Sequence, residues 1–220
     1  MGAVVLDMSM SLDGFVTGPN PRVGVGLGDG GQRLHEWMFS GRAGLDRPSE
    51  QSEPPDINGA VVRELFATTG AVLMGKTMFD VGVGPWADTP FPVPCFVLTH
   101  QPREDLVMTS GTFSFVTNGT ESGLDRAKTA AAGKNVLVHS PSVAQQLLRA
   151  GLLDDIQLHL VPILLGGGRR LFENIGERRG FELIKVIEAP DVTHLHYRLA
   201  SQAASGGEPA PAQPRPGVHL

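Results

Sequence analysis

Apolar residues gather along the chain in short runs, and the stretches between these runs have helical spacing. The apolar runs predict strands at 3–8, 70–74, 95–99, 113–116, 135–138, 155–165, 181–189 and 192–200. Helical spacing predicts helices at 34–39, 58–68, 124–132 and 143–149, with a short helical turn through Phe79 and another short helix after Gly168. Strands that alternate with helices are typical of βαβ units.

This order predicts one α/β domain over residues 1–200, with a mainly parallel central sheet, flanking helices and an antiparallel C-terminal edge. Residues 201–220 are rich in Pro, Gly and Ala and predict a disordered tail. Two further stretches, 17–31 and 46–55, have irregular composition. The glycines of 24–31 lack a following GK[ST], so this stretch predicts a mobile lid or a plain linker and not a phosphate loop.

Composition excludes several classes of function. The net charge is −5 and the pI is near 5.8, so long-range attraction to nucleic acid is not expected. Cys95 is the only cysteine, which excludes an intrachain disulfide and a cysteine-based metal cluster. No apolar run approaches the length of about 20 residues that a membrane span needs. We therefore expect a cytoplasmic protein with no nucleic-acid or membrane partner.

In open α/β sheets ligands bind beyond the carboxyl ends of the strands, so the residues that follow each strand are the candidates. Lys76 and Thr77 begin a helix, where a cation and a hydroxyl favour an anion, although a solvated lysine at a turn is the interpretation that the residues alone favour. The HSPS segment from His139 contains a good N-cap, Ser140, and ordinary helix capping accounts for it fully. A functional interpretation turns its imidazole and hydroxyls, including that of Ser142, toward a ligand.

The GGGRR segment is the most distinctive local feature. Gly168 permits a close backbone approach, and Arg169 can bind a phosphate or a carboxylate, although a tight turn with surface arginines is an equal alternative. Asp13 lies in a turn where a carboxylate can handle a proton, and Trp37 is either a core anchor or a pocket wall. His194 and His196 share one strand face without a third ligand at suitable spacing, so we expect no metal site.

Taken together, SLDGF, LMGKTMF, FVLTH and the run from Leu147 to Phe172 resemble the dihydrofolate reductase-like superfamily. The resemblance is greatest to the reductase domain of riboflavin biosynthesis and its stand-alone relatives, and it covers nearly all of residues 1–200. It implies an NADPH-dependent reductase that is usually a homodimer. Such an enzyme transfers hydride to a C=N or C=O group of a small heterocyclic or sugar-like substrate, as 5-amino-6-(5-phosphoribosylamino)uracil reductase does.

The resemblance also implies cofactor contacts at three turns: Gly75, Lys76 and Thr77; Thr99 and His100; and His139, Ser140 and Ser142. It further implies Asp13 as a catalytic or substrate-binding group, with Trp37, Gly168 and Arg169 at the substrate.

This chain departs from the family pattern at three of these positions. Lys76 replaces an arginine and loses its planar fork, and His100 stands where a cation is expected. The pair His139–Ser140 replaces Gly-Gly, which places side chains where a diphosphate approaches bare backbone. Two alternatives to the reductase therefore remain. One is a repurposed member that has lost NADPH and acts as a ligand-binding protein or a cofactor-independent tailoring enzyme. The other is a dimeric interaction module with a tethering tail.

Overall fold

A computed structural model describes residues 2–24, 26–40, 56–86 and 88–200. Within these residues nine strands form one sheet, in the order β4-β5-β3-β2-β6-β1-β7-β9-β8. The strands are β1 (Val4–Ser11), β2 (Thr69–Gly75), β3 (Cys95–Leu98), β4 (Leu106–Val107), β5 (Thr112–Val116), β6 (Asn135–Val138), β7 (Asp155–Val161), β8 (Phe181–Ala189) and β9 (Val192–Leu199).

The sheet is parallel in its middle and antiparallel at its edges. β1 lies between β6 and β7 and is parallel to both, and β2, β3 and β5 continue the parallel part. β9 pairs antiparallel with β7 and β8, and β4 pairs antiparallel with β5. The predicted mixed, mainly parallel sheet with an antiparallel C-terminal edge is confirmed.

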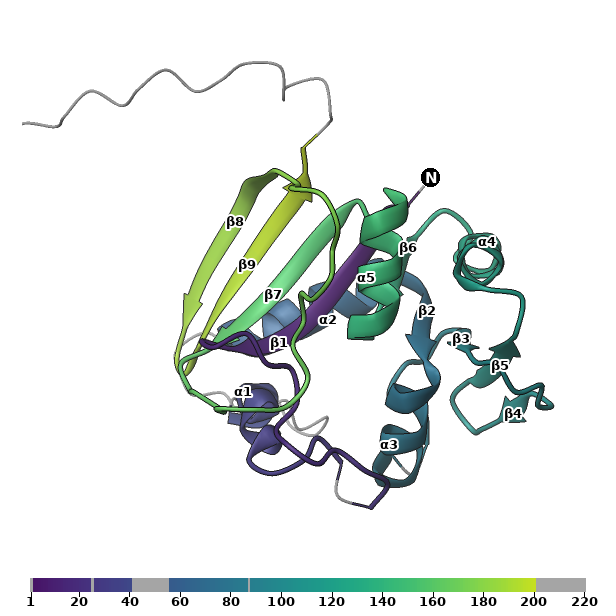
Figure 1. Ribbon diagram of the computed structural model, residues 1–220, viewed down its shortest axis with the longest axis horizontal. Helices are drawn as coiled ribbons and strands as arrows, with labels where there is room; N and C mark the ends of the chain where they lie inside the picture. The colour runs from purple at the N-terminus through teal and green to yellow at the C-terminus, as the bar shows by residue number, and fades with distance from the viewer. Residues whose placement is uncertain (1, 25, 41–55, 87, 201–220) are drawn as a thin grey trace, which may run out of the picture.

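Helices cover both faces of the sheet. In the described residues they are the 3-10 helix η1 (Gly31–His35), α1 (Trp37–Ser40), α2 (Ile57–Thr68), α3 (Lys76–Trp86), α4 (Thr120–Ala130) and α5 (Pro141–Ala150). α5 lies in front of the sheet and α2 behind it (Figure 1). Local sequence fixes their ends. The Asp56 carboxylate accepts from Gly59 N at 2.8 Å at the start of α2, and Gly151 ends α5 at φ 68°.

The core divides along the two faces of the sheet. Leu6 and Met8 of β1 pack with Leu124 of α4 and Leu147 of α5 on one face. On the other face, Met74 of β2 packs against Phe79 of α3 in a cluster with Phe91, Phe113 and Leu137. Each central strand therefore buries both of its faces, as a parallel sheet requires.

Apart from shifts of a few residues at the ends of elements, the structure differs from the sequence predictions in five places. The predicted helix 34–39 is divided into η1 and α1. β7 ends at Val161 rather than at residue 165, and no helix forms after Gly168, where turns and bends run from residue 162 to β8. Positive φ angles at Gly166 and Gly168 explain this, because they interrupt both strand and helix geometry. α3 continues beyond Phe79 to Trp86 because Val81 and Gly82 are also buried. The short strand β4 was not predicted.

Two predicted irregular segments, residues 46–55 and the tail 201–220, lie outside the described residues, so the domain boundary at residue 200 stays a prediction. The glycine-rich stretch 24–31 folds back on the preceding turn, where Gly18 N donates to Leu27 O at 2.8 Å. Among the described helices, none is long and apolar enough to cross a membrane.

Candidate functional site

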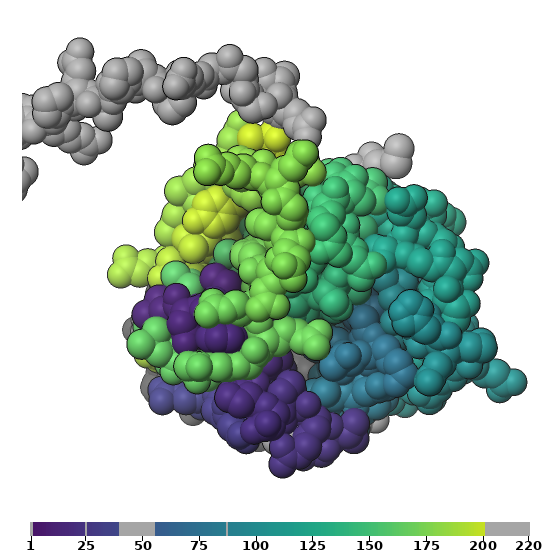
Figure 2. All heavy atoms as spheres, in the orientation of Figure 1, coloured from purple at the N-terminus to yellow at the C-terminus, as the bar shows by residue number. Residues whose placement is uncertain are grey.

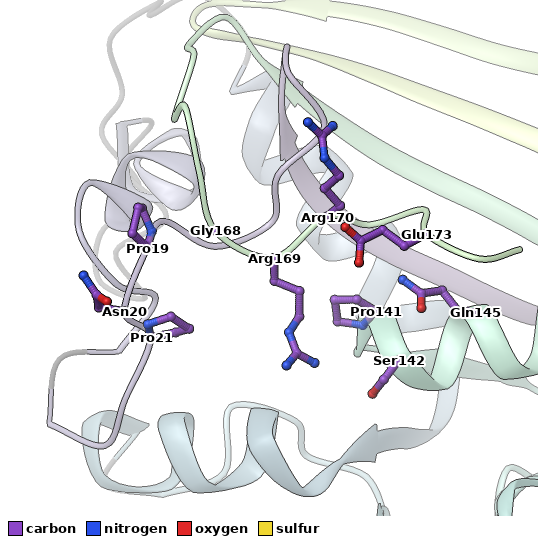
Figure 3. A pocket seen from close by; sticks show the side chains of 10 residues that line it. All are labelled: Pro19, Asn20, Pro21, Pro141, Ser142, Gln145, Gly168, Arg169, Arg170 and Glu173. Carbon is purple, nitrogen blue, oxygen red and sulfur yellow. The ribbon is translucent and has the colours of Figure 1, made fainter.

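A cleft of about 590 Å³ opens beyond the carboxyl ends of the central strands. Its walls come from the turn after β1, the N-terminus of α5 and the segment after β7 (Figure 3). In Figure 2 the N-terminal loop (purple), the segment after β7 (green) and α3 (blue) adjoin one another on this face. The lining residues are Pro19, Asn20, Pro21, Pro141, Ser142, Gln145, Gly168, Arg169, Arg170 and Glu173.

Arg169 reaches the cleft because its backbone is bound tightly to the loop after β1. Val16 N donates to Arg169 O at 2.9 Å, and Arg169 N donates to Thr17 Oγ1 at 3.1 Å. A β-carbon on Gly168 would lie 1.9 Å from Thr17 O, so glycine is required for this approach. The Arg169 side chain extends into the space between the loop at Pro21 and the start of α5 (Figure 3).

The N-terminus of α5 contributes hydroxyl groups to the same region. Ser140 is the N-cap, yet its hydroxyl makes no capping hydrogen bond and instead lies 3.3 Å from Ser142 Oγ. A β-carbon on Gly75 would lie 3.0 Å from Ser140 Oγ, so the glycine lets β2 end against this helix. Helix N-termini favour anions, and Arg169 adds a full positive charge nearby. The cleft is therefore suited to a phosphate.

A narrow slot of about 50 Å³ adjoins the cleft and shares Pro21, Pro141 and Arg169 with it. Its other walls are mostly apolar, with a few polar groups from η1, α3 and the end of β6. These walls are Met8, Val16, Thr17, Leu27, His35, Thr77, Met78, Val81, His139 and Ser140.

The imidazole of His139 is turned onto the sheet. Its Nδ1 lies 3.1 Å from Asp7 O, and since a carbonyl only accepts, Nδ1 carries the proton. The ring also packs edge-on against Phe91, with 5.5 Å between centroids. Burial lowers the pKa of His139, which keeps the ring neutral at pH 7. His139 lines the slot but not the cleft, so it leaves the phosphate-suited region open.

Behind the slot a buried chain of hydrogen bonds crosses β1, β7 and β9. Asp7 Oδ2 lies 3.0 Å from His159 Nε2, His159 Nδ1 lies 2.7 Å from His194 Nδ1, and His194 Nε2 lies 3.0 Å from Asn58 Oδ1. The Trp37 ring covers both imidazoles, at centroid distances of 4.6 and 4.9 Å. Asp7, His159 and His194 each expose 5% or less of their surface.

The direction of these hydrogen bonds fixes where the protons lie. Asn58 Nδ2 donates to Trp37 O at 3.1 Å, so Asn58 Oδ1 must accept from His194 Nε2. Burial lowers the pKa of His194 to about 4, so its other nitrogen is unprotonated and accepts from His159 Nδ1. One proton then remains between His159 Nε2 and Asp7.

That proton resides on His159. Burial opposes ionisation of Asp7, but the attraction and hydrogen bond of His159 outweigh burial and lower the pKa of Asp7. Asp7 and His159 thus form a buried hydrogen-bonded pair, and the Trp37 ring packs against the His159 imidazole.

The structure brings together six of the predicted site residues around the cleft and slot: Thr77, His139, Ser140, Ser142, Gly168 and Arg169. Gly75 adjoins them through Ser140. Lys76, Thr99 and His100 line neither space. Lys76 instead pairs with Asp80 one helical turn away, and Thr99 Oγ1 accepts from Gln101 N at 3.1 Å. Their contacts with a cofactor stay predictions.

Asp13 clamps two loops together. Its carboxylate accepts from Ser11 Oγ at 2.6 Å, Leu165 N at 3.1 Å and Gly166 N at 2.8 Å, and these bonds lower its pKa to about 2. Asp13 lines neither the cleft nor the slot, and its catalytic role stays a prediction. Trp37 is 3% exposed and donates to Ser9 Oγ at 3.0 Å, which makes it a core anchor, and its contact with substrate stays a prediction.

The sequence did not point to several lining residues, chiefly His35 and Gln145, whereas Arg170, which the GGGRR segment also offers as an anion ligand, does line the cleft. His35 lies on the predicted helix that carries Trp37, but nothing in the pattern distinguishes it from a surface histidine. His194 and His196, which share a strand face, belong to separate pairs, because His196 Nε2 lies 2.8 Å from Asp155 Oδ2. Within the described residues no group of three or more His, Cys, Asp or Glu side chains could hold a metal.

The comparison with protein families supplies the identity of this fold. The RibD C-terminal domain family matches residues 3–195. The chain belongs to this family. The comparison with curated proteins found no match.

Solved structures agree with the family. A Shewanella sp. PV-4 structure, described as a putative riboflavin biosynthesis protein, aligns with a TM-score of 0.63 and 20% identity over 90% of this chain and 99% of that one. The riboflavin biosynthesis reductase of Saccharomyces cerevisiae aligns with a TM-score of 0.54 and 12% identity over 90% of both chains. The dihydrofolate reductase of Enterococcus faecalis, complexed with NADP(H), aligns with a TM-score of 0.53 and 13% identity over 91% of this chain and 98% of that one. The dihydrofolate reductase-like fold is thereby confirmed.

Proposed function

We propose that this RibD C-terminal domain family member is an NADPH-dependent reductase that transfers hydride to a C=N or C=O group of a small heterocyclic or sugar-like substrate. One observation carries the proposal: Arg169 and the Ser142 hydroxyl converge at the N-terminus of α5, in a cleft beyond the parallel strands. The cleft volume of about 590 Å³ lies within the usual range for small-molecule sites. The similarity to reductases of riboflavin biosynthesis and to a dihydrofolate reductase supports it.

The residues present fit a dinucleotide phosphate. Arg169 offers a planar fork to a phosphate, and Ser142 adds a hydrogen-bond donor at the positive end of the α5 dipole. Bound NADPH would supply the hydride. The chain itself binds the phosphates in the cleft and excludes water in the mostly apolar slot, where the Thr77 hydroxyl and the imidazoles of His35 and His139 are among the polar groups that can orient a ring.

Fluorescence titration with NADPH tests the proposal. We expect saturable binding, and we expect Arg169→Ala to raise Kd by roughly 10- to 100-fold, since a hydrogen bond to a charged group contributes about 1.5–3 kcal/mol. Arg63→Ala is the matched control, because it also removes one exposed arginine, from α2. Absence of saturable binding at millimolar NADPH would refute the proposal.

The second candidate is a member that has lost the cofactor, and the His139–Ser140 pair favours it because the slot beside this pair is narrow. The double variant His139→Gly with Ser140→Gly separates the two functions. A large gain in NADPH affinity over a weakly binding wild type would establish lost binding. Tight binding by both proteins supports the reductase.

A homodimer in the cytoplasm completes the proposal. The edge strand β8 exposes apolar side chains at Leu183, Ile184 and Val186, which are 56%, 45% and 51% exposed, and a second copy would cover them. Sedimentation equilibrium tests the dimer. We expect Val186→Lys to shift the protein to monomer, and a monomeric wild type would refute this part of the proposal.

A further inference from the structure

The slot carries two imidazoles whose hydrogen bonding the protein leaves incomplete. His139 donates through Nδ1 to Asp7 O, so its Nε2 holds a free lone pair, and no described residue is hydrogen-bonded to that atom. On the opposite element, η1, the Nδ1 atom of His35 is buried and has no hydrogen-bond partner among the described residues. Buried polar atoms without partners are rare in folded proteins, and an absent ligand is one explanation for them.

The slot is less suited to an anion than the cleft is, since Arg169 is the one cation among the described residues that line it and lies at its border with the cleft. Burial lowers the pKa of His35 to about 4 and also lowers that of His139, so both rings are neutral at pH 7. The Asp7 carboxylate acts on both rings and disfavours a second negative charge. Met8, Val16 and Met78 supply apolar walls. Anionic groups belong in the adjoining cleft at Arg169, whereas the slot suits a neutral, flat group.

We propose that the slot binds a neutral amide group on a flat ring, with His139 Nε2 accepting the amide N–H and His35 facing the amide carbonyl. An amide carries one donor and one acceptor side by side, which matches the lone pair at His139 and the unpartnered nitrogen at His35. His139 is then a specificity-determining residue, at the position where sequence comparison suggested an obstruction. The inference rests on the proposed function for its main ligand. Both a nicotinamide carboxamide and the lactam of a heterocyclic substrate have this chemistry.

Two ligand pairs that differ in the amide N–H test the inference. The first is NADPH against its 3-acetylpyridine analogue, which replaces the amide NH₂ by a methyl group. The second is uracil against 1,3-dimethyluracil. Calorimetry on the wild type and on His139→Phe gives each affinity. We expect the wild type to prefer the N–H member of at least one pair by about tenfold or more, because a bound ligand without that donor leaves the acceptor at His139 unpaired and shielded from water.

In His139→Phe we expect the two members of each pair to bind with about equal affinity. The pair that loses its preference identifies whether the amide belongs to the cofactor or to the substrate. Equal affinities within both pairs in the wild type would overturn the inference, as would a preference that survives in the variant. If NADPH does not bind but uracil binds more tightly than 1,3-dimethyluracil, the proposed amide site in the slot is supported and the proposed reductase function is refuted. If NADPH and its analogue bind equally and the two uracils also have equal affinities, the reductase function is supported and the amide site is refuted.

Nitrogen-15 NMR of the wild type gives a check that needs no variant. We expect His139 to be neutral with its proton on Nδ1. A proton on Nε2 would overturn the inference, since that nitrogen could no longer accept.

Discussion

Replacing His159 by Leu tests the buried Asp7–His159 pair behind the slot. His159 Nε2 lies 3.0 Å from Asp7 Oδ2, and their side chains are 4% and 6% exposed. Removal of the imidazole leaves the buried carboxylate of Asp7 without its partner, a change that typically costs about 3–5 kcal/mol. In a domain of this size that corresponds to a fall in Tm of roughly 10 °C. Urea unfolding at pH 8 measures the loss directly.

The pH dependence of the same variant gives a sharper test. In the wild type the pKa of Asp7 lies below its usual value of 3.8, so its contribution to stability is lost only in stronger acid. In His159→Leu burial, the largest influence on Asp7, is opposed only by the weaker effects of His139 and His35, and we expect it to raise the pKa of Asp7 above the unfolded value. A group with a raised folded pKa stabilises the protein at low pH and loses that effect as pH rises. The deficit relative to the wild type is therefore smaller at pH 5 than at pH 8.

His196→Leu is the matched control, because it also removes a histidine beside an aspartate on the same sheet face. Asp155 keeps two hydrogen bonds from Arg198, at 3.1 and 3.2 Å, and the His196 side chain is 23% exposed. We expect a loss of about 1 kcal/mol with no comparable change between pH 5 and pH 8. If the two leucine variants lose equal stability at both pH values, the protonation assigned to Asp7 and His159 is wrong.

Three further predictions follow from other contacts. His35 and His194 have pKa values lowered to about 4 from 6.5, so between these pH values their imidazoles become protonated in the unfolded state but not in the folded state. The free energy of unfolding should therefore fall by up to about 2 kcal/mol per imidazole between pH 7 and pH 5. A free energy of unfolding that does not change over this range would contradict this. Gly168→Ala should lower the free energy of unfolding in urea by at least about 2 kcal/mol, because φ is 123° and the new β-carbon meets the Thr17 carbonyl. Gly166→Ala, with φ 70° and open space around the new β-carbon, should lower it by about 1 kcal/mol. Equal losses would disprove the close approach of Gly168 to Thr17. Asp13→Asn should lower Tm while leaving NADPH affinity intact, and the opposite pattern would assign Asp13 to the site instead of the loop clamp.

The fold could be predicted from the sequence to the extent that apolar runs and glycines determine it. The central strands are buried on both faces, so their runs are continuous and visible, as at Val4–Met8 and Ala71–Met74. β4 was missed because only Leu106 and Val107 form it, and Val107 is 76% exposed. The end of β7 was placed too late because Ile163 and Leu165 look like strand residues. The chain turns there to place Gly166 against Asp13.

The candidate site could be predicted only where it follows strand ends. Thr77, His139 and Arg169 stand directly after apolar runs or glycines, and the topology brings them together. The buried network could not be predicted, because its members are far apart in the sequence and become neighbours only through strand pairing. Asp7 lies opposite Gln157 in the β1–β7 register, so His159 is its diagonal neighbour two positions farther along β7. His194 of β9 lies directly opposite His159. No spacing rule within a single strand reveals such a contact.

A crystal structure of the protein with NADP⁺ tests the central claim most directly. The account predicts the diphosphate within hydrogen-bond distance of Ser142 Oγ and the Arg169 guanidinium, with the imidazole of His139 still turned toward Asp7 O. A dinucleotide bound elsewhere, or a cleft that stays empty in crystals grown with saturating NADP⁺, would contradict it.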